Sequence, residues 1–132
     1  MPLISRLECS IAGQVRTVRL LPGTTTARAY RREAAREAFR CNFGLKPKYR
    51  AKVLREPLRV AGVDDNGEVR VLELGNHPFF VATLYLPQLS STPTTPHPLI
   101  VAYLRATAVF HDSRGTGSVS GGPGKAPGRS AG

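Results

Sequence analysis

The most constraining feature of this sequence is a pair of adjacent apolar segments, Glu68–Leu74 and Phe79–Leu86, separated by Gly-Asn-His-Pro. They predict two β-strands joined by a turn. The second segment is apolar almost throughout, which is typical of a strand covered on both faces. Pro87 cannot donate a hydrogen bond to a sheet, so we expect the strand to end there, where functional side chains often lie. That end carries Leu86 and Gln88, and neither transfers a proton at neutral pH.

Upstream of this pair, the sequence predicts two strands and a helix. The strands are Leu3–Ala12 and Val15–Leu21, with a Gly-Gln turn between them. Thr24–Thr26 offers an N-cap for the segment Ala27–Ala38. That segment is rich in Ala and Arg and has few large apolar residues, so it predicts a surface helix, or a short helix followed by a loop.

The middle of the chain predicts short elements punctuated by proline and glycine. An Asp-Asp-Asn-Gly sequence precedes Glu68, and we interpret it as a turn because it lacks the alternating oxygen ligands of a cation-binding loop. The other expected elements are a strand at Ala38–Leu45, a helix at Lys48–Arg55, a strand at Leu58–Val63 and a helix at Pro98–Ala108.

The composition favours one cytoplasmic domain. The 132 residues, 41% of them hydrophobic, suffice for one core, and no apolar stretch is long enough to cross a bilayer. The N-terminus lacks a secretory signal pattern. Cys9 and Cys41 do not have metal-site spacing, so we expect two reduced thiols, no metal and no cofactor. Residues 111–132 are rich in Gly, Ser and Pro and predict a disordered basic tail behind a domain at 1–110.

A net charge of +10 raises a second class of function, a small basic module that binds nucleic acid. Cations are dense between Arg28 and Arg59. However, the chain has no Trp and no recognisable nucleic-acid-binding motif, and most of its aromatic residues lie in apolar segments. The charge pattern therefore favours solvated surface charge with nonspecific contacts.

The motifs resemble one protein family. H-P-F-F-V-A-T-L-Y-L-P-Q-L, starting at His77, and P-H-P-L, starting at Pro96, are similar to H-P-F-F-V-x-x-Q-F-H-P-E-F and P-H-P-L-F. The latter patterns are typical of the C-terminal end of the class I glutamine amidotransferase domain of CTP synthase, an enzyme of pyrimidine nucleotide biosynthesis. Glu37–Pro47 further resembles E-x-F/Y-x-C-x-Y/F-G-L-x-P, found in stand-alone relatives of this region. The resemblance runs from Leu3 to about Thr107.

This resemblance implies an α/β fold, namely the C-terminal half of a class I glutamine amidotransferase-like domain with a mixed sheet and flanking helices. It also implies a glutamine pocket at Arg40, Asn42 and Phe43. Asn42 stands where the family has the arginine that holds the substrate carboxylate, so the charged, bidentate grip of that arginine is lost.

Two of the three catalytic groups that the family uses are replaced in this chain. The family hydrolyses glutamine with a Cys-His-Glu triad, and the resemblance puts Leu86 at the histidine position and Gln88 at the glutamate position. Cys9 lacks the flanking glycines of a nucleophile elbow. We therefore expect a catalytically silent homologue. The alternatives are the nucleic-acid-binding module and a subunit that needs a partner chain, or a second copy, to complete its domain.

Overall fold

Five strands form the main sheet of the computed structural model, which describes residues 2–116. The strand order is β3-β2-β5-β6-β7, and every neighbouring pair in it is antiparallel. A second, two-stranded antiparallel sheet pairs β1 with β4. The strands are β1 (Ile4–Arg6), β2 (Val15–Leu20), β3 (Ala34–Ala38), β4 (Phe43–Leu45), β5 (Leu58–Asp64), β6 (Val69–Leu74) and β7 (Val81–Thr83).

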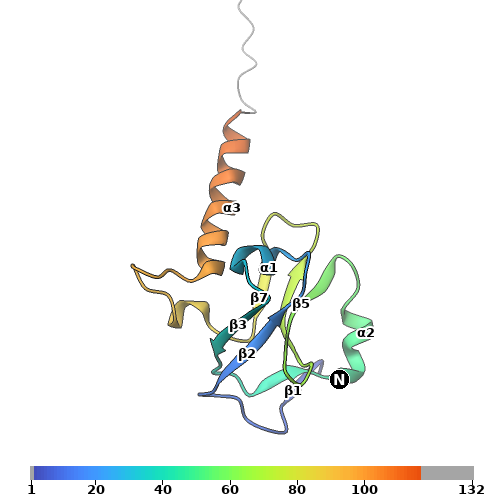
Figure 1. Cartoon of the computed structure of the whole chain (residues 1–132). Coiled ribbons are helices and arrows are strands. Elements are labelled where there is room, and N and C mark those ends of the chain that lie inside the picture. Colours follow the sequence, from blue (N-terminus) through green and yellow to red (C-terminus); the bar gives the residue numbers. More distant parts are fainter. Residues whose placement is uncertain (1, 117–132) are drawn as a thin grey trace, which may run out of the picture.

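The helices lie around this sheet, and the longest of them points away from it (Figure 1). That helix, α3, packs its beginning against α1. The combination of a curled sheet with helices confirms the predicted α/β class; within residues 2–116 the pairings are antiparallel. The helices are α1 (Thr25–Tyr30), the 3-10 turn η1 (Pro47–Tyr49), α2 (Arg50–Val53), the 3-10 turn η2 (Pro87–Leu89) and α3 (Pro98–Gly115).

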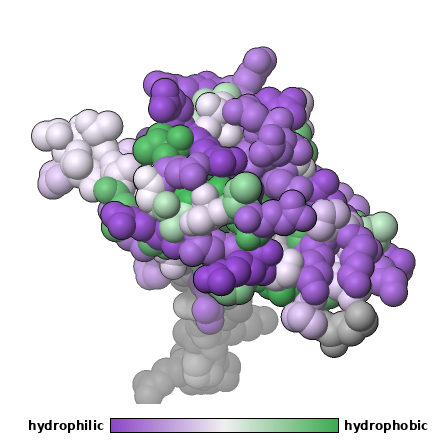
Figure 2. Space-filling view, turned by 90° about the horizontal axis from the view of Figure 1, so that it is seen from below, coloured by the Kyte–Doolittle hydropathy of each residue, from purple (hydrophilic) through white to green (hydrophobic). Residues whose placement is uncertain are grey.

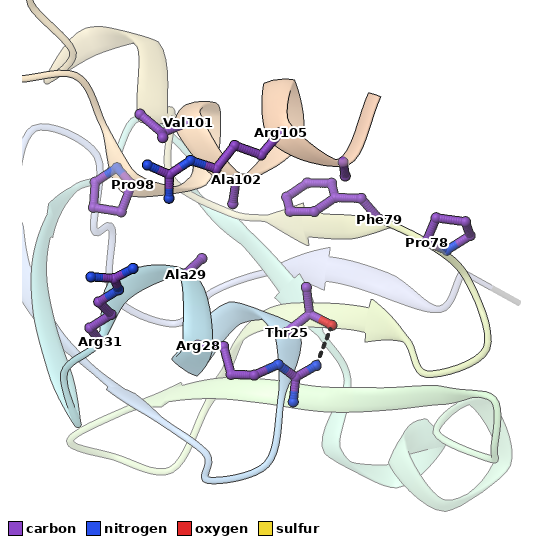
Figure 3. A pocket seen from close by; sticks show the side chains of 11 residues that line it. Thr25, Arg28, Ala29, Arg31, Pro78, Phe79, Pro98, Val101, Ala102 and Arg105 are labelled. Atoms are coloured by element: carbon purple, nitrogen blue, oxygen red, sulfur yellow. Dashed lines mark hydrogen bonds between the residues drawn. The ribbon is translucent and has the colours of Figure 1, made fainter. Parts of the chain in front are cut away.

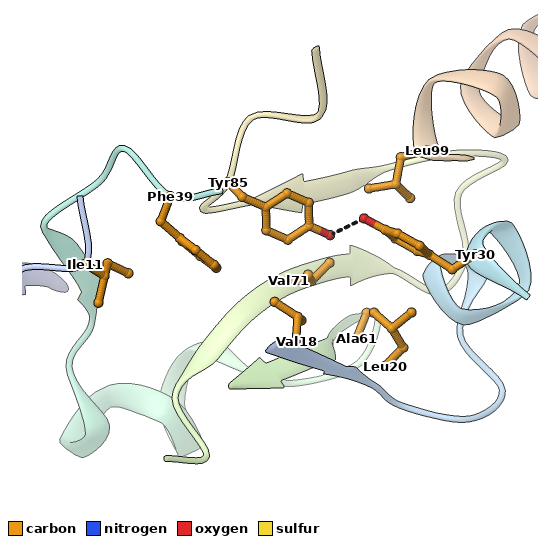
Figure 4. Close-up of a cluster of buried hydrophobic side chains, with 9 residues drawn as sticks. All are labelled: Ile11, Val18, Leu20, Tyr30, Phe39, Ala61, Val71, Tyr85 and Leu99. Carbon is orange, nitrogen blue, oxygen red and sulfur yellow. Dashed lines mark hydrogen bonds between the residues drawn. The ribbon is translucent and has the colours of Figure 1, made fainter. Parts of the chain in front are cut away.

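The hydrophobic core lies between one face of the sheet and the helices α1 and α3 (Figure 4). Val18, Ala61 and Val71 come from the three central strands and are fully buried. Phe39 and Tyr85 meet over them with ring centroids 5.7 Å apart, and their backbones form an isolated β-bridge. This aromatic contact joins the segment after β3 to the segment after β7.

The hairpin of β5 and β6 confirms the turn predicted before Glu68. The carboxylate of Asp64 accepts hydrogen bonds from the backbone N–H groups of Asn66 and Glu68 at 2.9 and 3.0 Å. Gly67 has a φ of 75°, a conformation that glycine adopts without a steric penalty. The same carboxylate faces Arg70, so the acidic residue at this turn serves the fold.

The segment Ala27–Ala38 differs from its prediction. Thr24 does cap a helix, because its Oγ1 accepts the N–H of Ala27 at 3.0 Å. That helix ends at Tyr30, and Ala34–Ala38 forms strand β3 instead of a longer helix or a loop. Residues 34–38 pair with residues 15–19 of β2. Pairing with a neighbouring strand has overridden the helical preference of Ala, Arg and Glu.

The second strand of the central pair is shorter and less buried than its sequence predicts. Only Val81–Thr83 is regular strand, and β7 is the last strand of the sheet within residues 2–116. Ala82 is exposed, and 44% of the surface of Phe80 is accessible to solvent. An apolar run alone does not distinguish a central strand from an outer one.

The two ends of the described chain also differ from prediction. The strand expected at Leu3–Ala12 is limited to Ile4–Arg6 and pairs with β4. The last helix continues beyond its predicted end to Gly115, and Leu99 near its start is buried, whereas Tyr103 and Leu104 are exposed. Residues 117–132 of the predicted tail lie outside the described residues. Among residues 2–116, no helix is sufficiently long and apolar to span a membrane.

Candidate functional site

A cavity of about 300 Å³ lies where the segment between β3 and β4 meets the segment after β7. It brings together Arg40, Asn42, Phe43 and Leu86, four of the five residues that the resemblance assigns to the site. The fifth, Gln88, is exposed on η2 and does not line the cavity. The lining residues are Arg40, Cys41, Asn42, Phe43, Leu84 and Leu86.

Backbone contacts fix one wall of this cavity. The carbonyl of Asn42 accepts the N–H of Leu7 at 2.7 Å, next to the β1–β4 pairing. The N–H of Phe43 donates to the Sγ of Cys41 at 3.3 Å, which turns the chain between these two residues. The side-chain oxygen of Asn42 accepts a hydrogen bond from Ser10 at 2.5 Å. The amide NH₂ of Asn42 is thus the part that remains for a ligand.

The cavity has one cation and no acid–base pair. Arg40 is exposed and has no ion-pair partner among residues 2–116. No histidine or carboxylate is present among the residues that line this cavity. Leu86, at the position that the resemblance assigns to the general base, presents a hydrocarbon side chain that is 39% exposed.

The histidines of the chain lie elsewhere. His77 is exposed in the turn after β6, where its Nδ1 accepts the N–H of Phe79 at 3.1 Å. His111 is exposed on α3 beside Asp112. His97 is buried at the start of α3. Cys9 lines a separate cavity of about 510 Å³ that, like the first, has no histidine among its lining residues.

A buried polar cluster lies in the core of the chain, and no sequence pattern indicates it. The carboxylate of Glu37 accepts a hydrogen bond from the Tyr30 hydroxyl at 2.5 Å and lies 2.8 Å from Nε2 of His97. The Tyr30 and Tyr85 hydroxyls are 3.0 Å apart. Burial, with smaller effects of Tyr85 and Glu37, raises the pKa of Tyr30 far above its usual value.

This cluster consists of residues that are distant in the sequence. Tyr30 ends α1, Glu37 belongs to β3, Tyr85 follows β7 and His97 precedes α3. Tyr85 lies between Leu84 and Leu86, two of the cavity-lining residues. The polar groups of the cluster contact one another, and Tyr85 connects the cluster to the cavity through the chain.

Two further buried carboxylates are paired with arginines. Arg70 donates to Asp64 through Nε at 2.9 Å and Nη2 at 2.7 Å. Burial would raise the pKa of Asp64, but hydrogen bonds from Arg70 and the Glu68 N–H hold this pKa below its usual value. Glu73 is paired in the same way with Arg59. Among residues 2–116, no group of three His, Cys, Asp or Glu side chains is arranged to hold a metal ion.

Two solved structures share the fold of this chain. The glutaminase domain of Trypanosoma brucei CTPS with bound acivicin has a TM-score of 0.74 at 19% identity, covering 81% of this chain and 46% of that one. A Thermoplasma acidophilum protein described as a GMP synthase subunit has a TM-score of 0.65 at 11% identity, covering 85% of this chain and 51% of that one. The described chain therefore has the fold of about half of a glutaminase domain.

Sequence comparison then identifies the relatives as CTP synthases, which confirms the resemblance seen in the motifs. The CTP synthase of Pelotomaculum thermopropionicum is 36% identical over 97 residues, or 73% of this chain and 18% of that protein. The CTP synthase of Gloeothece citriformis is 34% identical over 94 residues, or 70% and 17%. The chain is thus related to CTP synthase through the C-terminal part of its glutaminase region. It spans less than a fifth of the length of these relatives, and no protein-family model matches it.

Proposed function

We propose that this chain is a glutamine amidotransferase-like protein that does not itself hydrolyse glutamine. The observation that carries the proposal is the composition of the cavity between Arg40 and Leu86. It is lined by Arg40, Asn42 and Phe43, which the resemblance assigns to a glutamine pocket, but its walls offer no group that accepts a proton from a thiol.

The missing proton acceptor is decisive for the chemistry of amide hydrolysis. Amide hydrolysis by a cysteine requires a thiolate to attack the carbonyl carbon and a general base to take the thiol proton and return it to the leaving ammonia. Leu86 does neither. Cys41 lines the cavity, but the nearest polar contacts of its Sγ are the backbone groups of Phe43. Loss of such a group of catalytic residues typically lowers kcat by about 10⁶.

Ligand binding is also expected to differ from that of an active amidotransferase. Arg40 supplies a charged donor, whereas Asn42 supplies only its neutral amide NH₂, since its amide oxygen already accepts a hydrogen bond from Ser10. A neutral hydrogen bond holds a carboxylate less strongly than a bidentate guanidinium does. We therefore expect weak binding of free glutamine.

An ammonia-release assay tests this proposal. The purified chain is incubated with a range of glutamine concentrations, alongside Cys9→Ser and Cys41→Ser variants. We expect no saturable release and no difference among the three proteins. Saturable turnover that disappears in Cys41→Ser or Cys9→Ser would overturn the proposal and identify the nucleophile.

A second candidate function is that of a subunit that completes an amidotransferase with a partner chain. It is favoured by an apolar cavity of about 210 Å³ between the β1–β4 sheet and strands β6 and β7. Leu84 lines both this cavity and the one beside Arg40. A partner seated on the apolar cavity would therefore be next to the candidate glutamine pocket, where it could supply the missing base and thiol.

Co-purification distinguishes this candidate from the first. A partner that carries a G-x-C-x-G nucleophile elbow, together with glutaminase activity of the complex, would support it. Ala82→Arg places a charge at the exposed rim of the apolar cavity and should abolish capture. The matched control is Ala34→Arg, at an exposed position of strand β3 at the other end of the sheet. Equal capture by both variants would contradict the candidate.

A further inference from the structure

Another cavity, of about 450 Å³, lies between α1, α3 and the turn that precedes β7 (Figure 3). Its composition is unlike that of the cavity beside Arg40. Seven of its eleven lining residues are Ala, Pro, Val or Phe, and they include Phe79 and Val101. Three others are arginines, Arg28, Arg31 and Arg105.

The arginines make this cavity strongly cationic. No acidic residue lines it. Arg28 is held beside Thr25, to whose hydroxyl it donates at 3.2 Å. Arg31 and Arg105 have neither a hydrogen-bond nor an ion-pair partner for their side chains within the described part of the chain. Figure 3 shows their guanidinium groups at the same end of the gap between α1 and α3, that of Arg31 beside α1 and that of Arg105 beside α3.

The backbone of Arg31 gives a second, independent observation. Arg31 has a φ of 54°, and it is the one residue other than glycine with positive φ among residues 2–116. Helices that end in this conformation usually have glycine there, because a side chain adds steric cost. The backbone N–H of Arg31 caps α1 by donating to the carbonyl of Ala27. Among the described residues, the Arg31 guanidinium makes no hydrogen bond that would offset the steric cost. Strain of this kind is often retained where a side chain serves binding.

We propose that this cavity binds a phosphate monoester that carries an apolar or planar group. Guanidinium groups bind phosphate oxygens in a forked, charge-assisted geometry, and two unpaired arginines at one cavity suit the dianionic terminal phosphate. Phe79, Val101 and the surrounding small residues form an apolar wall for the rest of the molecule. The cavity is distinct from the candidate glutamine pocket, with which it shares no lining residue.

The cavity favours a small ligand over a nucleic-acid backbone. A phosphate diester chain presents one charge per phosphate along an extended line and is normally bound by a basic groove with aromatic platforms. Here three arginines line one cavity whose other walls are mostly apolar. The phosphate chemistry is common to both ligands, so the experiment includes both.

Calorimetric titration of the full chain tests the proposal with four probes: phenyl phosphate, inorganic phosphate, phenol and a single-stranded oligonucleotide of random sequence. We expect phenyl phosphate to bind more tightly than inorganic phosphate, and phenol not to bind. Inorganic phosphate binding as tightly as phenyl phosphate would overturn the proposed ligand class. An oligonucleotide that binds more tightly and competes with phenyl phosphate would overturn it in favour of a nucleic-acid site.

Arg31→Gly is the decisive variant because it removes the guanidinium and the backbone strain together. We expect phenyl phosphate binding to weaken about 10- to 100-fold, while the thermal midpoint stays the same or rises. Arg32→Ala is the matched control. It removes the charge of the next residue, whose side chain is exposed and does not line the cavity. Arg105→Gln tests the contribution of the second unpaired arginine, on α3, to phenyl phosphate binding. Equal effects of Arg31→Gly and Arg32→Ala, or no effect of Arg31→Gly and Arg105→Gln, would overturn the proposal.

Discussion

Glu73 links the sheet to α1 through a carboxylate that is completely buried. It accepts the backbone N–H groups of Thr25 and Thr26 at 2.9 and 3.0 Å and both Nε and Nη2 of Arg59. Burial would raise the pKa of Glu73, but the hydrogen bonds from Thr26, Thr25 and Arg59 hold this pKa below its usual value. The charged form is therefore the one that stabilises the fold.

We predict that Glu73→Gln lowers the free energy of unfolding at neutral pH by about 1–3 kcal/mol. Because the folded-state pKa of Glu73 is depressed, its contribution is complete above the ordinary value of 4.5 and is lost as the pH falls through the folded-state value. The difference between variant and parent should therefore shrink in acid. Urea unfolding across the acid range measures it, with Glu33→Gln on the exposed surface as the control. A difference that is independent of pH would contradict this account.

Tyr30 affects the stability of the fold at alkaline pH, as Glu73 does in acid. Burial, followed by the influence of Tyr85 and Glu37, raises its pKa above the ordinary value of 10.0. Its contribution to stability is complete below that value and is lost as the pH rises above it, because the unfolded chain ionises first. We predict a smaller alkaline loss of stability in Tyr30→Phe, at a cost of about 1 kcal/mol at neutral pH. Tyr103→Phe, on the exposed side of α3, should change neither quantity.

The predictability of individual residues follows from how local their contacts are. The turn at Asp64 is predictable because its hydrogen bonds reach only two to four residues along the chain. The pair of Glu37 and His97 escapes sequence reasoning because 60 residues separate the two. The sequence places His97 only before a helix, a role that it also fills, since its Nδ1 accepts the N–H of Leu99 at 3.2 Å.

At the level of elements, pairing with a neighbouring strand determines whether a segment forms a helix or a strand where its intrinsic propensity does not. Strand β3 consists of Ala, Arg and Glu, which favour helices, yet it pairs with β2 over five residues. The β5–β6 hairpin is predictable from alternating apolar residues and an Asn-Gly turn. The edge position of β7 is not, because it depends on which strand lies beside β6.

Gly62 allows one such close contact between strands. It lies at an irregularity in the β5–β6 register, and a Cβ atom there would come within 2.9 Å of side-chain carbons of both Val18 and Val71. We predict that Gly62→Ala destabilises the fold by about 1–3 kcal/mol, as overpacking of a core does. Gly115→Ala is the control, since nothing lies within 4 Å of the added methyl group. Thermal unfolding compares the two, and equal midpoints would show that the strands move apart at little cost.

At the scale of the whole molecule, four residues that the resemblance assigns to the site line one cavity, and its binding of glutamine stays a prediction. Arg40, Asn42, Phe43 and Leu86 converge although two separate segments supply them. Gln88 stays outside because the 3-10 turn at Pro87 carries it to the surface. The arginine-lined cavity at α1 and α3 has no sequence signature, since its residues come from three distant segments.

The net charge of +10 is the last property that separates the functional hypotheses. Hydrophilic residues cover most of the face in Figure 2, with small hydrophobic areas between them. The unpaired arginines of the α1–α3 cavity and Arg40 line different cavities. Charges that are dispersed in this way engage few phosphates at once. They attract nucleic acid without positioning it on base edges.

We therefore predict weak binding to duplex DNA without sequence preference. The logarithm of the association constant should fall with the logarithm of salt concentration with a slope of about −2 to −4, which corresponds to roughly two to four phosphates. Fluorescence anisotropy with two unrelated duplexes over a salt series measures both properties. Arg31→Gly and Arg40→Gln should each reduce the slope slightly and equally, because neither position reads a base. A steeper slope together with a preference for one duplex would instead favour the nucleic-acid-binding module over the silent amidotransferase homologue.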